Sequence, residues 1–570
     1  MRYLCARSGK ILLAITVGLS SMAWGQGGGN RRGNAAAQQQ PGAQTGTQPG
    51  APQTAAPQPT QPAAQQQPGT QERGGPGGRG GEATTNEFYN FDPNASQPRL
   101  GANIDAAPVE THQKITVNGQ TLAYTARAGF LPLMNATTGS PEAHVFYTSY
   151  SKEGLGDESR RPIMFFFGGA PGVSAAWQDF GGFGPKRMKS EGAWTDNPNT
   201  ILGEADLVFV NPVGTGFSFP VHPNRGSIFW NTQGDIASLG EFVRLYVSRN
   251  NRLASPLFVA GEDAATGRVG GLAAYLDEHM IPVRGVILLS MANAPDAVAG
   301  DTQYITLLPS LVISSWYHKK LSPELNAMSE EQITGQARQF ASREYLHALY
   351  KGDRMTPEER TKVIADLSRL TGLSKAFIVN NNLRITFDRY NAEVMRDEHR
   401  GVSRSDTRVA GFQPMAVGFG FGGGGGRFGG PPPTVDFYMS ETSGPFAATY
   451  TSYLRRELTF TGDKEGIFYL TTGGVGTFNS TGNDETSLST AFAHNPKLHL
   501  FVSVNYFDIG APFYATEYTL AHLNVSPEVR AHNIAVSHHE AGQMPYMDNK
   551  AVVKLERDLA NFVTETAETK

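Results

Sequence analysis

The chain has 570 residues, with 48 Lys and Arg against 52 Asp and Glu, so its formal net charge is -4 at neutral pH. This length leaves room for one large α/β domain with insertions, or for two or more domains. Because basic residues are not in excess, nucleic acid and anionic membrane surfaces are not expected partners.

The N-terminus predicts a cleavable secretory signal. Arg2, Arg7 and Lys10 precede an apolar run from Ile11 to about Leu19. This run is well under the roughly 20 residues that span a bilayer, so residues 1–25 are interpreted as a signal peptide and not as an anchor. We therefore expect an exported protein, periplasmic or secreted, whose mature chain has no membrane span. The single cysteine lies inside this signal, so the mature chain would have no disulfide.

Residues 26–85 consist mainly of Gln, Pro, Ala, Gly and Thr, with almost no aliphatic side chains to bury. Such a composition cannot offset the entropy lost on ordering. The segment is therefore predicted to be a disordered linker.

The remaining residues, 86–570, predict a domain in which strands and helices alternate. Asn118 and Gly119 are the turn pair that a type I′ β-hairpin prefers. The expected strands are Lys114–Val117, Gln120–Ala126, Ala143–Tyr150, Pro162–Phe167, Leu207–Val210, Val286–Leu289, Leu498–Val504 and Asn533–Ser537, and the expected helices are Ile236–Val247, Arg268–Glu278, Gly444–Glu457 and Asn549–Glu565. The alternation predicts an α/β fold with a mainly parallel central sheet and helices on both faces.

The segment LFVAGEDAATGRVGGL, from Leu257 to Leu272, is the part around which the rest is organised. A short apolar strand runs into a turn of small residues, and a helix is expected to open near Thr266. Small residues on both sides of Asp263 are typical of a nucleophile elbow, where a strained turn leaves no room for larger side chains. The side chain at the tip of this turn would be the nucleophile, and here it belongs to Asp263.

Several segments together resemble one known family. FFFGGAPGVSAAW, ADLVFVNPVGTGFSF, LFVAGEDAATGRVGGLAAYL, VNYFDIGAPFYATEYTLAHL and HHEAGQMPY are similar, in this order, to the oxyanion-loop, Asn-Pro, elbow, acid and histidine segments of the serine carboxypeptidase family. The resemblance extends roughly from Gln113 to Phe562. It implies an α/β-hydrolase fold and an enzyme that removes C-terminal residues from peptides at acidic pH.

The resemblance carries over only in part to the catalytic positions. The family's nucleophilic serine, in GESY, falls on Asp263, and its acid falls on Asp508. Its histidine, in AGHM, falls on Gln543. Glutamine has no titratable nitrogen and cannot act as a general base. The resemblance therefore implies the fold while leaving the chemistry incomplete.

The substrate-binding positions are also altered. The resemblance places the backbone donors of the oxyanion hole at Ala170 and Ala264. The asparagine that helps the family hold the substrate's terminal carboxylate falls on Gly168, whereas the glutamate with the same task is kept as Glu262. Half of this carboxylate clamp is therefore missing.

Other side chains near the expected site are candidate substitutes for the missing serine and histidine. His538 or His539 could replace the missing base, but an imidazole would have to reach Asp508, and histidines of a loop or core are the more common case. Ser174 and Thr266 are hydroxyls near the site, and Thr266 is expected to cap the helix that follows.

The carboxylates Asp263, Asp508 and Glu262 could in principle hold a divalent cation, but no spaced ligand motif accompanies them, so no metal or cofactor is predicted. Asp263 and Asp508 would face each other across a neutral Gln543. Their repulsion is expected to raise the pKa of Asp263.

An insertion of about 309–439 resembles the family's helical cap over the active site. Helical spacing is present in Glu330–Ala348, Pro357–Leu370 and Tyr390–Arg396. Gly418–Pro433, which is GFGFGGGGGRFGGPPP, predicts a flexible loop.

These observations leave three hypotheses. The first is a non-catalytic member of the serine carboxypeptidase family with a cleft for a peptide or small-molecule ligand. The second is a hydrolase with Asp263 as nucleophile, as in haloalkane dehalogenases and epoxide hydrolases, which still need a base to activate water. The third is an active hydrolase in which another hydroxyl takes the serine's place. The first is favoured, because fold alone does not guarantee chemistry.

Overall fold

The structure is a computed structural model that describes residues 107–169, 172–263, 265–291, 299–413, 435–461, 468, 470 and 484–568. The predicted signal peptide, the 26–85 linker, the Gly418–Pro433 loop, Ala170 and Ala264 lie outside these residues.

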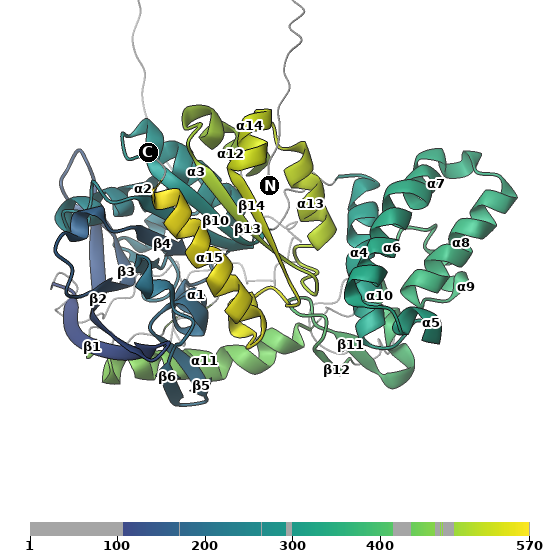
Figure 1. Ribbon diagram of the computed structural model, residues 1–570, viewed down its shortest axis with the longest axis horizontal. Coiled ribbons are helices and arrows are strands. Elements are labelled where there is room, and N and C mark those ends of the chain that lie inside the picture. Colours follow the sequence, from purple (N-terminus) through teal and green to yellow (C-terminus); the bar gives the residue numbers. More distant parts are fainter. Residues whose placement is uncertain are drawn as a thin grey trace, which may run out of the picture. The chain divides into compact units, whose positions relative to one another are not determined.

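The described strands include a ten-stranded sheet in the order β1-β2-β3-β7-β4-β9-β10-β13-β14, with β8 paired to β3 (Figure 1). The strands of this sheet are β1 (Val109–Val117), β2 (Gln120–Met134), β3 (Pro141–Lys152), β4 (Ile163–Phe167), β7 (Asp206–Val210), β8 (Phe219–Pro220), β9 (Leu257–Asp263), β10 (Val283–Met291), β13 (His499–Asn505) and β14 (Ile534–His539). From β7 to β14 every neighbouring pair in this order is parallel, and β1, β2 and β3 add an antiparallel edge. The mainly parallel central sheet that the sequence predicts is confirmed.

The first hairpin forms at the predicted turn. Asn118 and Gly119 have φ values of 50° and 77°, as a type I′ turn requires, and Val117 pairs with Gln120 across it. Both strands are longer than predicted, because the pairing continues outward as far as Val109 and Ala128. Two smaller two-stranded sheets join β5 (Lys186–Ser190) to β6 (Ala193–Asp196) and β11 (Arg400–Val402) to β12 (Ala410–Phe412).

The parallel strands are buried on both faces, and their side chains alternate between two hydrophobic cores. In β4, Phe165 and Phe167 belong to one core, while Met164 and Phe166 belong to the other. This is the period of two that a strand imposes on its side chains. The uninterrupted apolar sequence of β4 is therefore the sequence of a strand covered from both sides.

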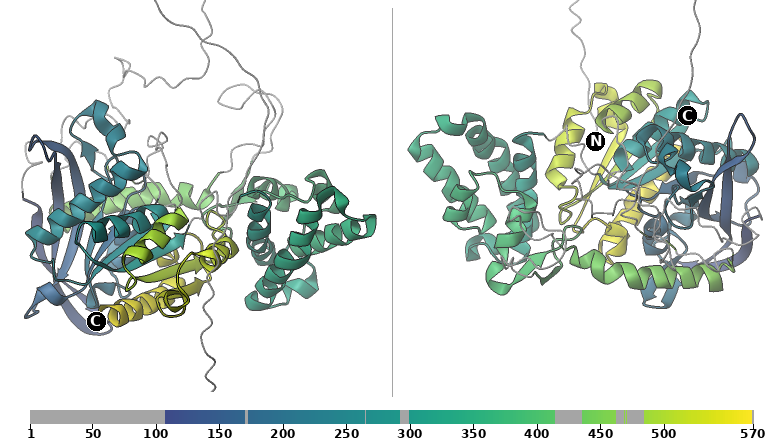
Figure 2. Two further views of the ribbon diagram at one scale, coloured as in Figure 1. Left: turned by 90° about the horizontal axis from the view of Figure 1, so that it is seen from above. Right: turned by 180° about the vertical axis from the view of Figure 1, so that it is seen from behind.

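Helices cover both faces of this sheet (Figures 1 and 2). α2 (Thr232–Arg249) and α3 (Ala265–Glu278) pack on one face, while α1 (Ala176–Gln178), α11 (Phe437–Arg456) and α15 (Ala551–Glu568) pack on the other. The remaining helices of the carboxyl-terminal part are α12 (Asp484–His494), which packs on α3, α13 (Phe513–His522) and α14 (Pro527–His532). Among the described residues, none of the helices has the length and apolar character needed to span a membrane.

A second group of helices lies between β10 and β11 in sequence. It comprises α4 (Thr302–Tyr317), α5 (Pro323–Asn326), α6 (Glu330–Phe340), α7 (Leu346–Lys351), α8 (Pro357–Thr371), α9 (Lys375–Asn380) and α10 (Phe387–Val394). The helical stretches expected in the insertion correspond to α6 with α7, to α8 and to α10. Pro309, where the insertion was expected to begin, lies inside α4.

The helical insertion is joined to the core by charge as well as by packing. Arg338 of α6 forms an ion pair with Glu517 of α13, with 2.6 Å between Nη2 and Oε1. The Arg338 guanidinium also lies 4.8 Å from the ring centre of Phe513. Because α13 directly follows the loop that carries Asp508, this contact ties the insertion to the region of the candidate site.

Candidate active site

Asp263 lies at the tip of a strained turn between β9 and α3. It is the last residue of β9, its φ is +55°, and α3 begins at Ala265. A positive φ is uncommon for a residue with a side chain, although aspartate tolerates it better than most. The strand, turn and helix predicted for Leu257–Leu272 are therefore present, and the half-buried Asp263 occupies the strained position.

The loop after β4 lies directly against this turn. A Cβ atom added to Gly169 would lie 3.1 Å from the Glu262 carbonyl oxygen and 3.6 Å from Asp263 Cβ. At Gly168 an added Cβ would lie only 1.7 Å from the Val173 carbonyl oxygen. This backbone shape therefore admits only glycine at position 168, so the family's asparagine could not be accommodated there without moving the loop.

A buried ion pair fixes the loop to α3, and sequence reasoning missed it. Arg268 Nη1 donates to the carbonyl oxygens of Gly168 and Gly169 at 2.7 and 2.9 Å. Arg268 Nε donates to Asp235 of α2 at 2.6 Å, and both side chains are buried. The sequence did contain a signal for this ion pair. Arg268 lies in the apolar run of a helix that covers a sheet, and a charge buried there rarely lacks a partner.

Glu262, which precedes Asp263, is buried. Its Oε2 accepts hydrogen bonds from Tyr546 Oη at 2.6 Å and from Gln178 Nε2 at 3.3 Å, while its Oε1 has no hydrogen-bond partner among the described residues. Burial, followed by the negative charges of Asp263 and Asp508, raises the pKa of Glu262 to about 8. The environment of Glu262 thus favours the protonated form of its carboxyl group.

Asp508 lies in the loop after β13 and is 1% exposed. Its Oδ1 accepts hydrogen bonds from the backbone N–H groups of Gly510 and Ala511 at 2.8 and 3.1 Å, whereas Oδ2 has no hydrogen-bond partner among the described residues. Burial, and after it the charge of Asp263, raises the pKa of Asp508 to about 8. The charge of Asp263 thus contributes to the shift at Asp508, with burial as the larger cause, and the raised pKa expected for Asp263 stays a prediction.

Gln543 is held by its backbone beside the same region. Its N–H donates to the Ser405 carbonyl at 2.6 Å, and its carbonyl accepts from Ser290 Oγ at 2.6 Å. Ser290, at the end of β10, also accepts a hydrogen bond from Asn505 Nδ2 of β13. Ser290 thus links the strand beside the elbow to the strand that leads to Asp508, a role that its sequence does not indicate.

Neither candidate histidine occupies a base position. His538 Nε2 lies 2.9 Å from Glu517 Oε1, and its ring stacks on Tyr506. His539 is buried, and neither of its ring nitrogens has a hydrogen-bond partner among the described residues. Burial, followed by the charge of Lys554, lowers the pKa of His539 to about 4. Neither imidazole is therefore hydrogen-bonded to Asp508.

The hydroxyl of Ser174 is engaged elsewhere. Its Oγ donates to Asn211 Oδ1 and accepts from the Ala176 N–H at 3.1 Å, and the residue is fully buried. The side chain of Thr266 lies outside the described residues. Because Ala170 and Ala264 are also outside them, the oxyanion hole stays a prediction.

Within the described part of the chain, no three or more His, Cys, Asp and Glu side chains are grouped so that they could hold a metal ion. This holds for Asp263, Asp508 and Glu262, although the charges of the two aspartates each influence the pKa of Glu262.

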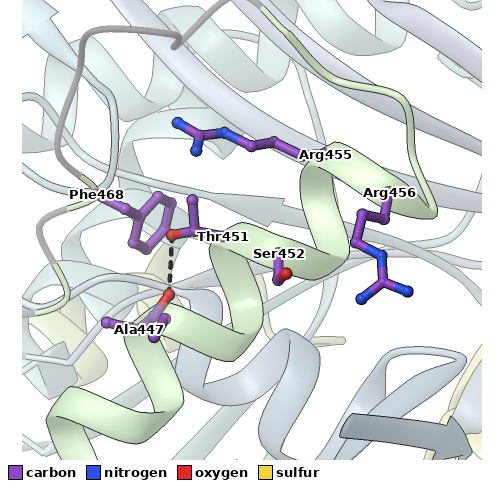
Figure 3. A pocket seen from close by; sticks show the side chains of 7 residues that line it. Ala447, Thr451, Ser452, Arg455, Arg456 and Phe468 are labelled. Atoms are coloured by element: carbon purple, nitrogen blue, oxygen red, sulfur yellow. Dashed lines mark hydrogen bonds between the residues drawn. The ribbon is translucent and has the colours of Figure 1, made fainter. Parts of the chain in front are cut away.

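A cavity of about 590 Å³ lies along α11, at a distance in sequence from all of these residues. Its walls are Ala447, Ala448, Thr451, Ser452, Arg455, Arg456 and Phe468. Figure 3 shows the Arg455 and Arg456 side chains extending to different sides of the helix, and the Thr451 hydroxyl donates to the Ala447 carbonyl at 2.8 Å. The guanidinium of Arg456 lies 5.3 Å from the ring centre of Trp194. No residue of the elbow, the acid loop or the Gln543 loop lines this cavity.

Comparisons with known proteins agree with this geometry. Residues 117–285 match the family described as "Serine carboxypeptidase", a range that includes Gly168, Glu262 and Asp263 but ends before Asp508 and Gln543. Among curated proteins, "Serine carboxypeptidase S10 family member 1" of Dictyostelium discoideum is 26% identical over 202 residues, which are 35% of this chain and 45% of that protein. "Serine carboxypeptidase-like 36" of Arabidopsis thaliana is 29% identical over 153 residues, which are 25% of this chain and 31% of that protein. The matched region thus spans less than half the length of these relatives.

A solved structure extends the match beyond that region. The crystal structure of a prohormone-processing carboxypeptidase from Saccharomyces cerevisiae aligns with 77% of this chain and 91% of that chain, with a TM-score of 0.52 and 13% sequence identity. At this identity the likeness concerns the fold. The chain thus has an α/β-hydrolase fold, and over residues 117–285 its sequence is similar to the serine carboxypeptidase family.

Proposed function

We propose that this protein is a non-catalytic member of the serine carboxypeptidase family, which binds a peptide or small-molecule ligand in the family's cleft without hydrolysing it. The observation that carries the proposal is the set of hydrogen-bond partners around the Asp508 carboxyl group. Its Oδ1 is held by backbone N–H groups, and neither His538 nor His539 is hydrogen-bonded to its Oδ2. In a working triad the acid's carboxylate accepts a hydrogen bond from the histidine ring and so orients the base.

Both reacting positions support the same conclusion. Asp263 occupies the strained tip where the family's nucleophile would lie, and a carboxylate does not replace an alcohol in acyl transfer to a peptide. Gln543 cannot accept a proton, and the hydrogen bond of His538 is with Glu517. Ser174, the other hydroxyl considered, donates to Asn211. None of the described substitutes for the serine or the histidine is therefore positioned to act.

The proposal is tested by rebuilding the missing groups. The wild-type chain is expected neither to release C-terminal residues from peptides nor to react with a serine-directed phosphonate. Asp263→Ser alone and Gln543→His alone should remain inactive, because members of a triad act as a unit. The double variant should hydrolyse activated esters at least about a hundredfold faster than either single variant.

Either of two results would contradict the proposal that the protein is non-catalytic. One is peptide turnover by the wild-type chain that Asp263→Asn abolishes. The other is wild-type turnover that survives Asp263→Asn but is lost in His538→Gln or His539→Gln. Circular dichroism of each variant controls for loss of fold.

A second candidate function has one observation in its favour. The φ of +55° places an aspartate at the elbow tip, as in hydrolases with a nucleophilic carboxylate. Such an aspartate would displace halide from an alkyl halide and form an ester, with halide as the leaving group. Because Gln543 cannot activate water, the ester would persist. Intact-protein mass spectrometry after incubation with a chloroalkane would detect it as a mass increase that is absent from Asp263→Asn.

We further propose that the protein is exported, with a signal at 1–25, a linker at 26–85 and a family domain at 86–570 that includes a helical cap. The charged, apolar and small residues of the N-terminus support this division. Mass spectrometry of protein from the cell envelope is expected to show a chain that begins near Gln26. A chain with an intact Met1, recovered from the cytoplasm, would contradict it.

A further inference from the structure

A cavity of about 290 Å³ lies beside the acid loop, between the core and the helical insertion. Its core wall includes Ile509 and Gly510, which directly follow Asp508 in the chain. The other walls come from the start of α13, from α4 and from the amino end of α10. A small molecule in this cavity would therefore contact the same loop that holds the Asp508 carboxyl group.

Among the described residues that line this cavity, Arg404 is the basic one. Its carbonyl accepts a hydrogen bond from the Ile509 N–H at 3.2 Å, which ties it to the acid loop. A Cβ atom added to Gly510 would lie 3.8 Å from Arg404 Nε and 3.2 Å from Asp508 Oδ1. Arg404 and Asp508 thus border the same glycine, and the absence of a side chain at Gly510 keeps the space between them open.

The remaining walls suit the apolar body of a small anion. Leu307, Ile509, Pro512 and Ala515 contribute apolar surface, and Phe387 lies with its ring centre 5.9 Å from Arg404 Cζ. Phe387 is also the first residue of α10, an eight-residue helix whose amino end favours negative charge. The acidic side chain in the lining, Asp388, is exposed, so solvent screens its repulsion of an anion.

The carboxylate clamp expected at the elbow cannot bind the carboxylate of a ligand. Gly168 lacks an amide side chain, and its backbone shape leaves no room for one. Glu262 is buried and bonded to Tyr546 and Gln178. Arg404, by contrast, is exposed and carries a fixed positive charge with a planar donor geometry that matches a carboxylate.

We propose that this cavity binds a small carboxylate with an apolar body, of the class of N-acylated amino acids, and that the Arg404 guanidinium holds the carboxylate. The acyl and side-chain carbons would lie along Leu307 and Pro512. This inference rests on the proposed ligand-binding function and specifies the ligand class and the residue that selects it.

Calorimetric titration of the full-length protein with N-benzoylglycine, and with its neutral N-methylamide as the matched probe, tests the proposal. The acid is expected to bind at least about tenfold more tightly than the amide, which is what one charge-assisted hydrogen bond contributes. Arg404→Gln should weaken binding of the acid about tenfold to a hundredfold and leave the amide unchanged. Arg404→Lys should restore part of the loss, because the charge returns without the planar geometry.

Two further variants locate the site. Leu307→Trp would fill the cavity and should weaken both probes, whereas Arg160→Gln removes an arginine whose side chain is 87% exposed elsewhere on the surface and should change neither. Equal affinity for acid and amide, an unchanged affinity in Arg404→Gln, or no binding of the acid at 10 mM (about 3 kcal/mol of binding free energy) would overturn the proposal. Peptide hydrolysis by the wild-type chain would instead overturn the non-catalytic function, and it would leave the titration result standing.

Discussion

Two sets of buried carboxyl groups differ in their hydrogen bonding. Asp235 and Asp179 belong to the scaffold of the fold. Asp235 pairs with Arg268, which in turn binds the loop after β4. Asp179 Oδ2 accepts hydroxyl donors from Thr148, Tyr150 and Tyr450 at 2.7, 3.2 and 2.8 Å. These scaffold carboxylates have strong partners on several elements of the fold.

Glu262 and Asp508 form the second set, at the site itself. Each has one oxygen that accepts two hydrogen bonds and one oxygen without a hydrogen-bond partner among the described residues. Buried polar atoms without partners are rare in folded proteins and call for an explanation. Here the raised pKa values of both groups supply one, because a protonated oxygen is far less costly to bury than a charged one. The contrast teaches that the scaffold acids are bonded to side chains of several elements of the fold, whereas each site acid keeps one carboxyl oxygen without a hydrogen-bond partner among the described residues.

The largest effect is expected from breaking the scaffold ion pair. Asp235→Ala would leave the Arg268 guanidinium buried without its carboxylate, and such a change costs about 3–5 kcal/mol. The free energy of unfolding, from urea titration at pH 7, measures it. Glu241→Ala on the same helix removes an ion pair with Arg244 that is partly exposed, and should cost at most about 1 kcal/mol. Similar losses in the two variants would contradict the distinction.

A somewhat smaller loss is expected at Asp179. Asp179→Ala would leave the hydroxyls of Thr148, Tyr150 and Tyr450 in the core without their acceptor, at a cost of about 2–3 kcal/mol. Asp179→Asn keeps an acceptor oxygen and should lose less. If the alanine variant unfolds at the wild-type urea concentration, the cluster is not a stabilising part of the scaffold.

The site carboxyls should show their protonation in the dependence of stability on pH. Burial raises the pKa of Asp508 from 3.8 to about 8 and that of Glu262 from 4.5 to about 8. Between these values the folded chain holds protons that the unfolded chain has released, so the free energy of unfolding falls as the pH rises. The stability contributed by the two groups is complete below about pH 4 and is lost as the pH passes through about 8.

The variant Asp508→Asn removes the titration of Asp508, so its difference from the wild type measures the contribution of this one group. Between pH 5 and pH 8 the wild-type chain should lose stability more steeply than the variant, by about 1 kcal/mol per pH unit. Urea titrations at pH 5, 6, 7 and 8 measure both slopes, and the comparison between them cancels the other titrating groups, Asp179 included. Parallel slopes would mean that the pKa of Asp508 is not raised in the folded chain.

The sequence was sufficient for the fold because its signals were local and repeated. The Asn118–Gly119 turn, the apolar run of β4 and the small residues around Asp263 each determine their own backbone shape. The resemblance then placed Asp508 in the loop after its strand. These features needed no knowledge of contacts between distant residues.

The interactions around the site depend on such contacts, and sequence reasoning could not supply them. Arg268 reaches Gly168 across about a hundred residues of chain, and Ser290 meets Gln543 over a still longer separation. Burial is the main cause of the raised pKa at Asp508, a shift that the sequence did not predict, and the raised pKa expected for Asp263 stays a prediction. Burial is a property of the packed core and has no pattern of its own in the sequence.

The smallest effect is expected at Glu262, and it gives the sharpest comparison with the scaffold. If Glu262 is neutral at pH 6, then Glu262→Gln replaces one neutral group by another of nearly the same shape. The glutamine oxygen can still accept from Tyr546 and Gln178, and the amide nitrogen takes the place of the oxygen that has no partner. The variant should therefore unfold within about 1 kcal/mol of the wild type at pH 6, because no buried charge is removed or left alone. Tyr546→Phe serves as the control, since it deletes the 2.6 Å donor to Glu262 and should destabilise the chain by more than the glutamine variant does. A loss above about 2 kcal/mol in Glu262→Gln would show that Glu262 is ionised in the folded chain, and the division between scaffold and site acids would fail.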